Sequence, residues 1–210
     1  MKKSLLYIGI LFGAFGCHRP IKELRTGDLL FQVGRKSDIS SAIAAATGDE
    51  VPIPFTHVGI AICCPGADSV LEATSPDGVR MTALDEFLDK SARTDDRPLA
   101  VAMRLKDTTG TAAAVIRACT RIGQPYDYSY RPDNGKMYCS ELIWVSYRRP
   151  DGSPIFPARP MNFRAADGSM PQFWVELFEK SGEEIPEGIP GTNPADMSRD
   201  SSLKEVFRWF

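Results

Sequence analysis

Short apolar runs separated by turn-forming residues dominate the first half of the chain. Runs of about four to eight apolar and β-branched residues, bounded by Gly, Pro or Asp, are typical of buried strands. Pro76-Asp77-Gly78 lies between two of these runs and favours a turn there. The pattern predicts strands over residues 28–33, 56–62, 69–73, 78–82 and 98–105.

Helical spacing of apolar residues appears between and after the strands. Ser37-Asp38 supplies an N-cap for an alanine-rich run that ends at Thr47-Gly48, and a second run stops at Gly123. The mixed order of elements indicates an α+β fold in which helices flank an antiparallel meander. Helices are predicted over 39–46, 84–88, 111–122, 137–147 and 173–178, and residues 203–210 are predicted to pack back as a strand or short helix.

The N-terminus has the pattern of an export signal. Two lysines give it a positive start, an apolar stretch runs from Leu5 to Phe15, and a small residue precedes Cys17. That stretch is too short for an ordinary membrane-spanning helix. It is similar to a bacterial lipoprotein signal, in which the cysteine is lipidated and becomes the new N-terminus. We expect a signal peptide over 1–17, lipidation of Cys17 and one domain over 18–210 in the cell envelope; secretion with cleavage nearby is the alternative.

Net charge and the distribution of apolar residues limit the classes of partner that the chain is expected to bind. The chain has 210 residues and a net charge of -2, so it lacks the general positive field that nucleic-acid binding requires. No apolar run after the signal is long enough to cross a bilayer. The mature part is long enough for one substantial core and short for two. We expect no nucleic-acid partner, and contact with a membrane only through the lipid anchor at Cys17.

Cysteine spacing argues against a dense disulfide scaffold and against a zinc site. The predicted domain carries Cys63, Cys64, Cys119 and Cys139, and no pair has the two-residue gap of a zinc knuckle. Only one histidine remains in the predicted core, so neither a metal nor another cofactor is expected. Whether Cys63, Cys64 and Cys119 are free or paired stays open.

Cys139 stands in the first turn of the helix predicted over 137–147. A helix N-terminus brings partial positive charge and unpaired backbone N–H groups to the sulfur. Both lower the pKa of a thiol, and the N–H groups can hold the oxyanion of a tetrahedral intermediate. Leu142 and Ile143 place Cys139 on the face packed against the core, so a small buried cysteine is the alternative interpretation.

A Cys–His hydrolase needs a base, and His57 is the candidate, because His18 lies beside the lipidation site. Glu72 lies on the next predicted strand, fifteen residues after His57. Two antiparallel strands joined by a turn bring its carboxylate to the far nitrogen of the imidazole, where it fixes the tautomer and stabilises the imidazolium. A satisfied core histidine and a glutamate on an exposed strand face are the alternatives.

Four segments occur in an order that resembles a known family. They are Gly27-Asp28-Leu29-Leu30-Phe31, Thr56-His57-Val58-Gly59-Ile60, Leu71-Glu72-Ala73 followed by Gly78-Val79, and Tyr138-Cys139-Ser140-Glu141-Leu142. Over 27–147 the chain resembles the YaeF/YiiX-like permuted papain-fold amidases of the wider NlpC-type superfamily. In that family the histidine strand precedes the cysteine helix. The resemblance implies a circularly permuted papain-like fold, with a curled antiparallel sheet packed against helices.

The resemblance also implies roles for individual residues. Cys139 would be the nucleophile, His57 the base and Glu72 the third, polar member of a triad. Residues 123–127 resemble a family segment that precedes the cysteine helix. A packed tyrosine is the alternative for each tyrosine near the site. The candidates for lining the substrate cleft are Tyr126, Tyr128 and Tyr138.

Related enzymes act on amide or ester bonds, including those of cell-wall peptides and acyl chains. Together with the export signal, this predicts an envelope cysteine hydrolase that cleaves a peptide or acyl-amide bond through a thioester, with murein peptide as a candidate substrate. One alternative is a non-catalytic peptide- or lipid-binding lipoprotein, and another is a thiol acyltransferase or lipid hydrolase of the same fold. An apolar cleft favours acyl chains, whereas carboxylate- and amine-binding groups favour peptides.

Overall fold

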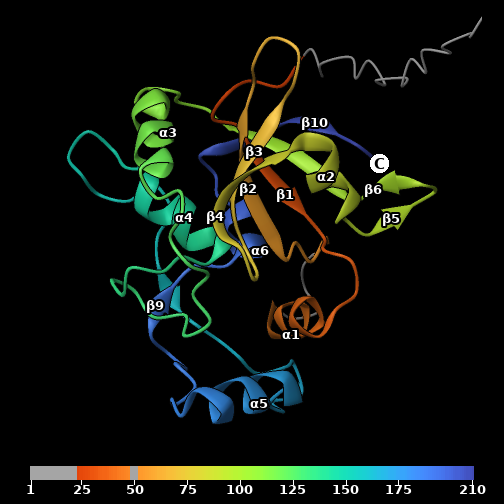
Figure 1. Cartoon of the computed structure of the whole chain (residues 1–210), viewed down its shortest axis with the longest axis vertical. Helices are drawn as coiled ribbons and strands as arrows, with labels where there is room; N and C mark the ends of the chain where they lie inside the picture. The colour runs from red at the N-terminus through yellow and green to blue at the C-terminus, as the bar shows by residue number, and fades with distance from the viewer. Residues whose placement is uncertain (1–22, 48–51) are drawn as a thin grey trace, which may run out of the picture.

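A six-stranded antiparallel sheet organises the molecule (Figure 1). The computed structural model describes residues 23–47 and 52–210. The strands of the sheet are β1 Leu29–Gln32, β2 His57–Ile62, β3 Ser69–Thr74, β4 Gly78–Ala83, β7 Ala100–Leu105 and β10 Leu203–Arg208. Their order is β10-β7-β1-β2-β3-β4, and each neighbouring pair is antiparallel.

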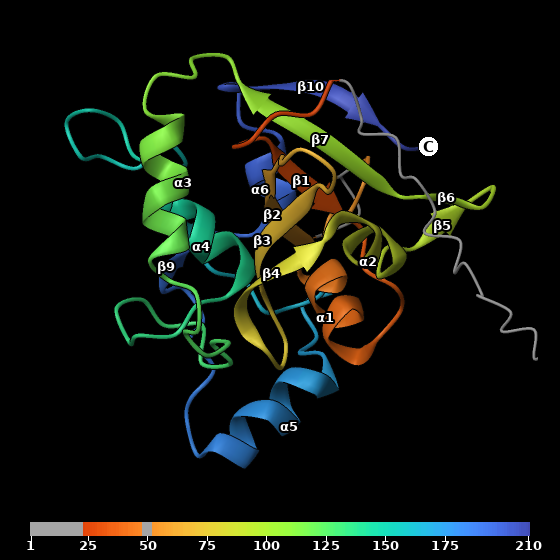
Figure 2. The same cartoon turned by 45° about the horizontal axis from the view of Figure 1, so that its top comes forward.

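Both faces of the sheet are covered, which explains the nearly continuous apolar sequence of its central strands. The helices are α1 Asp38–Thr47, α2 Leu84–Asp89, α3 Thr111–Cys119, α4 Cys139–Ser146, α5 Gln172–Ser181 and α6 Pro194–Ser198. Leu29 and Phe31 of β1 pack into the core shared with α3 and α4, whereas Leu30 packs into the core shared with α2. Figure 2 shows α3 and α4 together on one side of the molecule and α2 on the other.

An aromatic cluster lies at the end of the molecule where α1 contacts α5. Figure 1 shows these two helices at the bottom of the view. Tyr130, Phe163 and Trp174 stack edge-on, with ring centroids between 5.1 and 5.8 Å apart. Tyr138, the residue before α4, packs against Tyr130 at 5.4 Å. This cluster therefore joins the start of α4 to the C-terminal third of the chain.

The predicted α+β class is confirmed, and three of the predicted elements are shorter than predicted by two residues or more at one end. The strand predicted over 98–105 is broken at Leu99, because β6 Arg97–Pro98 pairs with β5 Arg93–Thr94 in a separate hairpin. The helix predicted over 137–147 begins at Cys139, since the backbone of Met137 forms a bridge with Tyr126. The helix predicted over 111–122 ends at Cys119 and continues as turns.

Three short elements of the C-terminal region were not predicted. They are β8 Arg159–Pro160, β9 Pro190–Gly191 and α6. The C-terminal segment, predicted as a strand or short helix, is the strand β10. The predicted signal peptide and Cys17 lie outside the described residues. Within the described part, no helix combines the length and apolarity needed to span a bilayer.

Candidate active site

Cys139 is the first residue of α4 and is almost wholly buried, with 4% of its surface exposed. The chain enters the helix through Tyr138, whose extended backbone (φ -95°, ψ 167°) is that of an N-cap residue. The first residues of a helix keep N–H groups that have no partner within the helix. The Cys139 sulfur therefore lies where the helix dipole and these N–H groups stabilise negative charge.

His57 begins β2, and Glu72 lies on the neighbouring strand β3. His57 Nε2 is 2.5 Å from Glu72 Oε2. The side chain of Glu72 is fully buried and that of His57 is 17% exposed. The interaction with Cys139 raises the pKa of His57, and because Nε2 is engaged with Glu72, Nδ1 is the ring nitrogen left to face the thiol. The three residues predicted as a triad are thus brought together from three elements.

Gly59 allows the two strands to bring these side chains into contact. A Cβ at Gly59 would lie 2.4 Å from Val70 Cγ1 and 3.3 Å from Glu72 Cβ. A side chain at this position would push β3 away from β2. The glycine two residues after His57 therefore has a steric role in the geometry of the site.

The interactions among these side chains shift the pKa values of His57 and Glu72. Burial alone would lower the pKa of His57, but its interactions with Cys139 and with the carboxylate of Glu72 raise it to about 10. Burial alone would raise the pKa of Glu72. The bond to His57 and the imidazolium charge lower it, helped by Thr82 and Lys90. The arrangement favours a protonated imidazole held against the ionised carboxylate of Glu72.

Two cavities meet at the Cys–His pair. An open cleft with a volume of about 710 Å³ is lined by His57 and Glu72, and a smaller pocket of about 60 Å³ is lined by Cys139. Ile43 and Tyr126 line both, so one wall runs past the pair. The charged lining of the cleft comprises Arg35, Asp85, Glu86, Asp89 and Lys90, and the aromatic lining of the pocket comprises Tyr126, Tyr130, Tyr138, Phe163 and Trp174.

Two of the three tyrosines predicted near the site line these cavities. Tyr126 and Tyr138 are buried, and Tyr138 also accepts a hydrogen bond from the backbone N–H of Thr192 at 3.3 Å. Tyr128 is 37% exposed and lies outside both linings. Its hydroxyl bonds to Ser75, and its ring packs edge-on against Tyr126 at 5.0 Å. Tyr128 therefore supports Tyr126 from outside the cavities.

The segment between β9 and α6 is hydrogen-bonded to the start of α4, which carries Cys139. Ser140 Oγ donates to the carbonyl of Thr192 at 2.9 Å, and Tyr138 accepts from its N–H, so both neighbours of Cys139 contact one residue. The sequence predicted no role for Thr192. Asn193-Pro194 is a helix-start signal, with an N-cap residue before Pro at N1, and it marks α6. Nothing in that signal indicates contact with α4.

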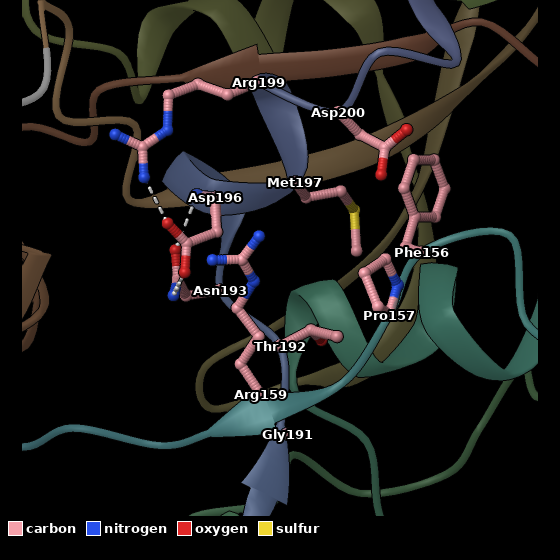
Figure 3. Close-up of a pocket in the computed structure, with 10 residues that line it drawn as sticks. All are labelled: Phe156, Pro157, Arg159, Gly191, Thr192, Asn193, Asp196, Met197, Arg199 and Asp200. Atoms are coloured by element: carbon pink, nitrogen blue, oxygen red, sulfur yellow. Dashed lines mark hydrogen bonds and ion pairs between the residues drawn. The ribbon is translucent and has the colours of Figure 1, made fainter.

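A third cavity, with a volume of about 90 Å³, shares Thr192 and Asn193 with the smaller pocket that Cys139 lines (Figure 3). Asp196 is bonded within it to Asn193, with Nδ2 of Asn193 2.9 Å from Oδ2, and it forms an ion pair with Arg199. Arg159 projects from β8 toward the same carboxylate in Figure 3. This lining includes neither the thiol of Cys139 nor an imidazole, so we place the reactive centre at the other two cavities.

The remaining cysteines line neither of the two cavities at the site. Cys63, Cys64 and Cys119 carry free thiols, as Cys139 does, which answers the question that the sequence left open. Burial raises the pKa of Cys63 to about 11, with help from the charge of Asp68, so its thiol is a poor nucleophile at neutral pH. Across residues 23–47 and 52–210, no group of three or more His, Cys, Asp or Glu side chains is arranged to hold a metal ion.

Known proteins share this architecture. A family model for the permuted papain-like amidase enzymes, YaeF/YiiX, C92 family, matches residues 23–207. YiiX of Escherichia coli strain K12, an uncharacterized protein, is 27% identical over 190 residues, which cover 89% of this chain and 86% of that protein. A crystal structure of YiiX from Escherichia coli O157:H7, described as a metalloprotein, has a TM-score of 0.69 and 24% identity, covering 89% of this chain and 98% of that one. The predicted permuted papain-like fold is confirmed.

Proposed function

Because the chain belongs to the YaeF/YiiX (C92) family of permuted papain-like amidases, we propose that it is an envelope cysteine hydrolase that cleaves an amide bond through Cys139, His57 and Glu72. The observation that carries the proposal is the 2.5 Å contact of His57 with a fully buried carboxylate, beside a cysteine at a helix N-terminus. A buried carboxylate is costly unless it is paired. Its placement on the far side of the imidazole matches the third member of a triad.

The first half of the proposed reaction forms an acyl-enzyme. His57 takes the proton of the Cys139 thiol, and the thiolate attacks the carbonyl carbon of the amide. The carbonyl π electrons move to oxygen, and N–H groups at the start of α4 hold the oxyanion. When the tetrahedral intermediate collapses, the C–N bond breaks and His57 gives its proton to the departing amine. A free amine and a thioester on Cys139 result.

Water completes the reaction. It attacks the thioester carbonyl while His57 removes one of its protons. The C–S bond then breaks, a carboxylic acid leaves, and the Cys139 thiol is regenerated. Glu72 stays ionised throughout, where it orients the imidazole and stabilises its positive form.

The two cavities support separate binding places for the acyl half and the amine half of the substrate. Cys139 keeps the acyl group, so the acyl half belongs in the aromatic pocket that Cys139 lines. His57 protonates the amine, so the amine half belongs in the charged cleft that His57 lines. Gln32 Oε1, buried in the cleft wall, has no hydrogen-bond partner among the described residues and is ready to accept from that half. We therefore propose an acyl-amide or peptide with an apolar acyl half and a polar amine half, with cell-wall peptides among the candidates.

The cellular location is part of the proposal. The Lys2-Lys3 start, the apolar stretch and Cys17 support export and a lipid anchor, which would hold the domain at a membrane surface. Metabolic labelling of the full chain with a palmitate analogue tests this directly. Labelling that is lost in Cys17→Ala is expected, and equal labelling of that variant would contradict the anchor.

The test of activity is a panel of acyl amides and murein peptides incubated with the purified mature protein and with Cys139→Ala. We expect product release only from the protein with Cys139, with the highest kcat/KM for an apolar acyl group joined to a polar amine. Turnover retained in Cys139→Ala would overturn the nucleophile assignment.

The aromatic pocket gives the acyltransferase or lipid-hydrolase alternative a specific basis, since an acyl ester can occupy it as well as an acyl amide. Matched acyl esters and added amine acceptors in the same panel separate these activities. Saturable binding without turnover of any member would instead favour the non-catalytic binding protein.

A further inference from the structure

Glu72 is held through both oxygens of its carboxylate, and the reaction proposed above uses only one of them. Oε2 faces His57 at 2.5 Å. Oε1 accepts a hydrogen bond from the hydroxyl of Thr82 at 2.6 Å. Thr82 lies on β4 and is 1% exposed, and Glu72 is 0% exposed, so bulk water does not compete for this bond.

The geometry points to Thr82 as a positioning residue for the triad, because its hydroxyl fixes the carboxylate of Glu72 in the plane that presents Oε2 to His57. The terminal torsion of a glutamate is broad, so a single hydrogen bond leaves the carboxylate free to turn. A second bond, to the other oxygen, removes that freedom. The inference rests on the function proposed for Cys139, His57 and Glu72 and adds a fourth side chain to it.

The sheet register explains why Thr82 reaches Glu72. Within the β3–β4 ladder Glu72 lies opposite Arg80 and Val70 lies opposite Thr82, so Thr82 and Glu72 are diagonal neighbours on one face. A threonine hydroxyl carries a single proton, and at 2.6 Å from a carboxylate oxygen it makes a charge-assisted bond.

Charged and titratable groups face Glu72 from each element packed against it. Lys90 Nζ lies 3.9 Å from Oε1 of Glu72 but 3.0 Å from Glu86, and its side chain is 42% exposed. It therefore contributes a screened charge, whereas Thr82 contributes a directed bond. The groups that face Glu72 are His57 on β2, Arg80 on β4, Lys90 after α2 and, beyond the imidazole, Cys139.

The test compares Thr82→Val, which keeps the shape and loses the donor, with Thr82→Ser, which keeps the donor. The rate of Cys139 alkylation by iodoacetamide is followed from about pH 5 to about pH 9 in the mature protein and both variants, and a melting curve accompanies each. We expect Thr82→Val to move the midpoint of Cys139 reactivity upward by about one pH unit, which is about a tenfold loss of thiolate below the midpoint. Thr82→Ser should stay close to the unaltered protein.

The outcomes separate this inference from the proposed function. An activated Cys139 with the same profile in Thr82→Val overturns the role of Thr82 and leaves the triad standing. An ordinary thiol profile in the unaltered protein overturns the triad and the role of Thr82 with it. Thr82→Ala, which also lacks the hydroxyl but needs less space, should match Thr82→Val, and it decides the question if the valine variant does not fold.

Discussion

In the proposed mechanism, the reactivity of Cys139 depends on two neighbours that contribute in different ways. The N-terminus of α4 supplies a fixed field, which falls off within the first turn of a helix. His57 supplies a positive charge that exists only while the imidazole is protonated. Because Cys139 and the buried carboxylate of Glu72 both raise the pKa of His57, to about 10, that charge persists to a pH far above the ordinary range of histidine.

The two partners of Cys139 should differ in their effect on catalysis. His57→Ala removes the proposed general base and is expected to lower kcat/KM by about 10²- to 10⁴-fold. Glu72→Gln keeps the shape of the side chain and loses only its negative charge, so its loss should be smaller. Steady-state kinetics on the best substrate of the panel measures both. An equal or larger loss in Glu72→Gln would show that its role is not merely supportive.

The sequence predicted which residues meet at the site but not which residues hold them there. Cys139, His57 and Glu72 lie in short motifs whose order resembles a family, so they were predicted without a structure. Thr82 and Thr192 lie in no such motif. The Thr82 hydroxyl gains its role from strand register, and the backbone of Thr192 gains its role from a contact between distant segments. A single sequence carries no signal for either.

At the scale of elements, periodicity predicted the sheet strands and the longer helices because each buries an apolar face. Periodicity failed where backbone hydrogen bonds to another segment determine where an element begins. Met137 has helix-forming neighbours, yet its N–H and C=O bond to the loop before it, so α4 begins two residues later and Cys139 becomes its first residue. Two-residue strands such as β8 and β9 are too short for any period to show.

The β2–β3 pair should tolerate no side chain at Gly59. In Gly59→Ala the new Cβ meets Val70 and Glu72, and overpacking of this kind costs about 1–3 kcal/mol of unfolding free energy. Urea denaturation measures the cost, and activity should fall because Glu72 is displaced. Lys204→Ala, on the exposed side of β10, is the control and should stay within about 0.5 kcal/mol of the unaltered protein. A Gly59→Ala protein as stable and active as the control would contradict the steric role.

At the scale of the whole molecule, Glu141 and His57 make the free energy of unfolding fall as the pH rises. Burial raises the pKa of Glu141 to about 8 from 4.5, so its ionisation in the unfolded chain costs stability between these values. The pKa of His57 rises from 6.5 to about 10, so its contribution is complete below 6.5 and is lost as the pH rises through 10. Glu72 acts oppositely: its lowered pKa gives stability that is present above 4.5 and lost in acid.

Substitution can separate the pH range in which Glu141 affects stability from the range in which His57 does. Glu141→Gln keeps an acceptor for the N–H of Tyr138 and removes the titration, so stability should become flatter between pH 4.5 and 8. His57→Gln should flatten the range between 6.5 and 10 instead. Urea midpoints at a series of pH values measure both slopes. A Glu141→Gln protein that keeps the original slope below pH 8 would show that this carboxyl ionises normally in the folded state.

The most direct test of the central claim is the rate of Cys139 alkylation by iodoacetamide as a function of pH, in the mature protein and in His57→Ala. Peptide mass spectrometry resolves Cys139 from Cys63, Cys64 and Cys119. The proposed triad predicts that Cys139 reacts well below the pKa of a free thiol, about 8.5, and that His57→Ala loses this reactivity. A slow Cys139 with an ordinary pH profile, unchanged by His57→Ala, would contradict the account.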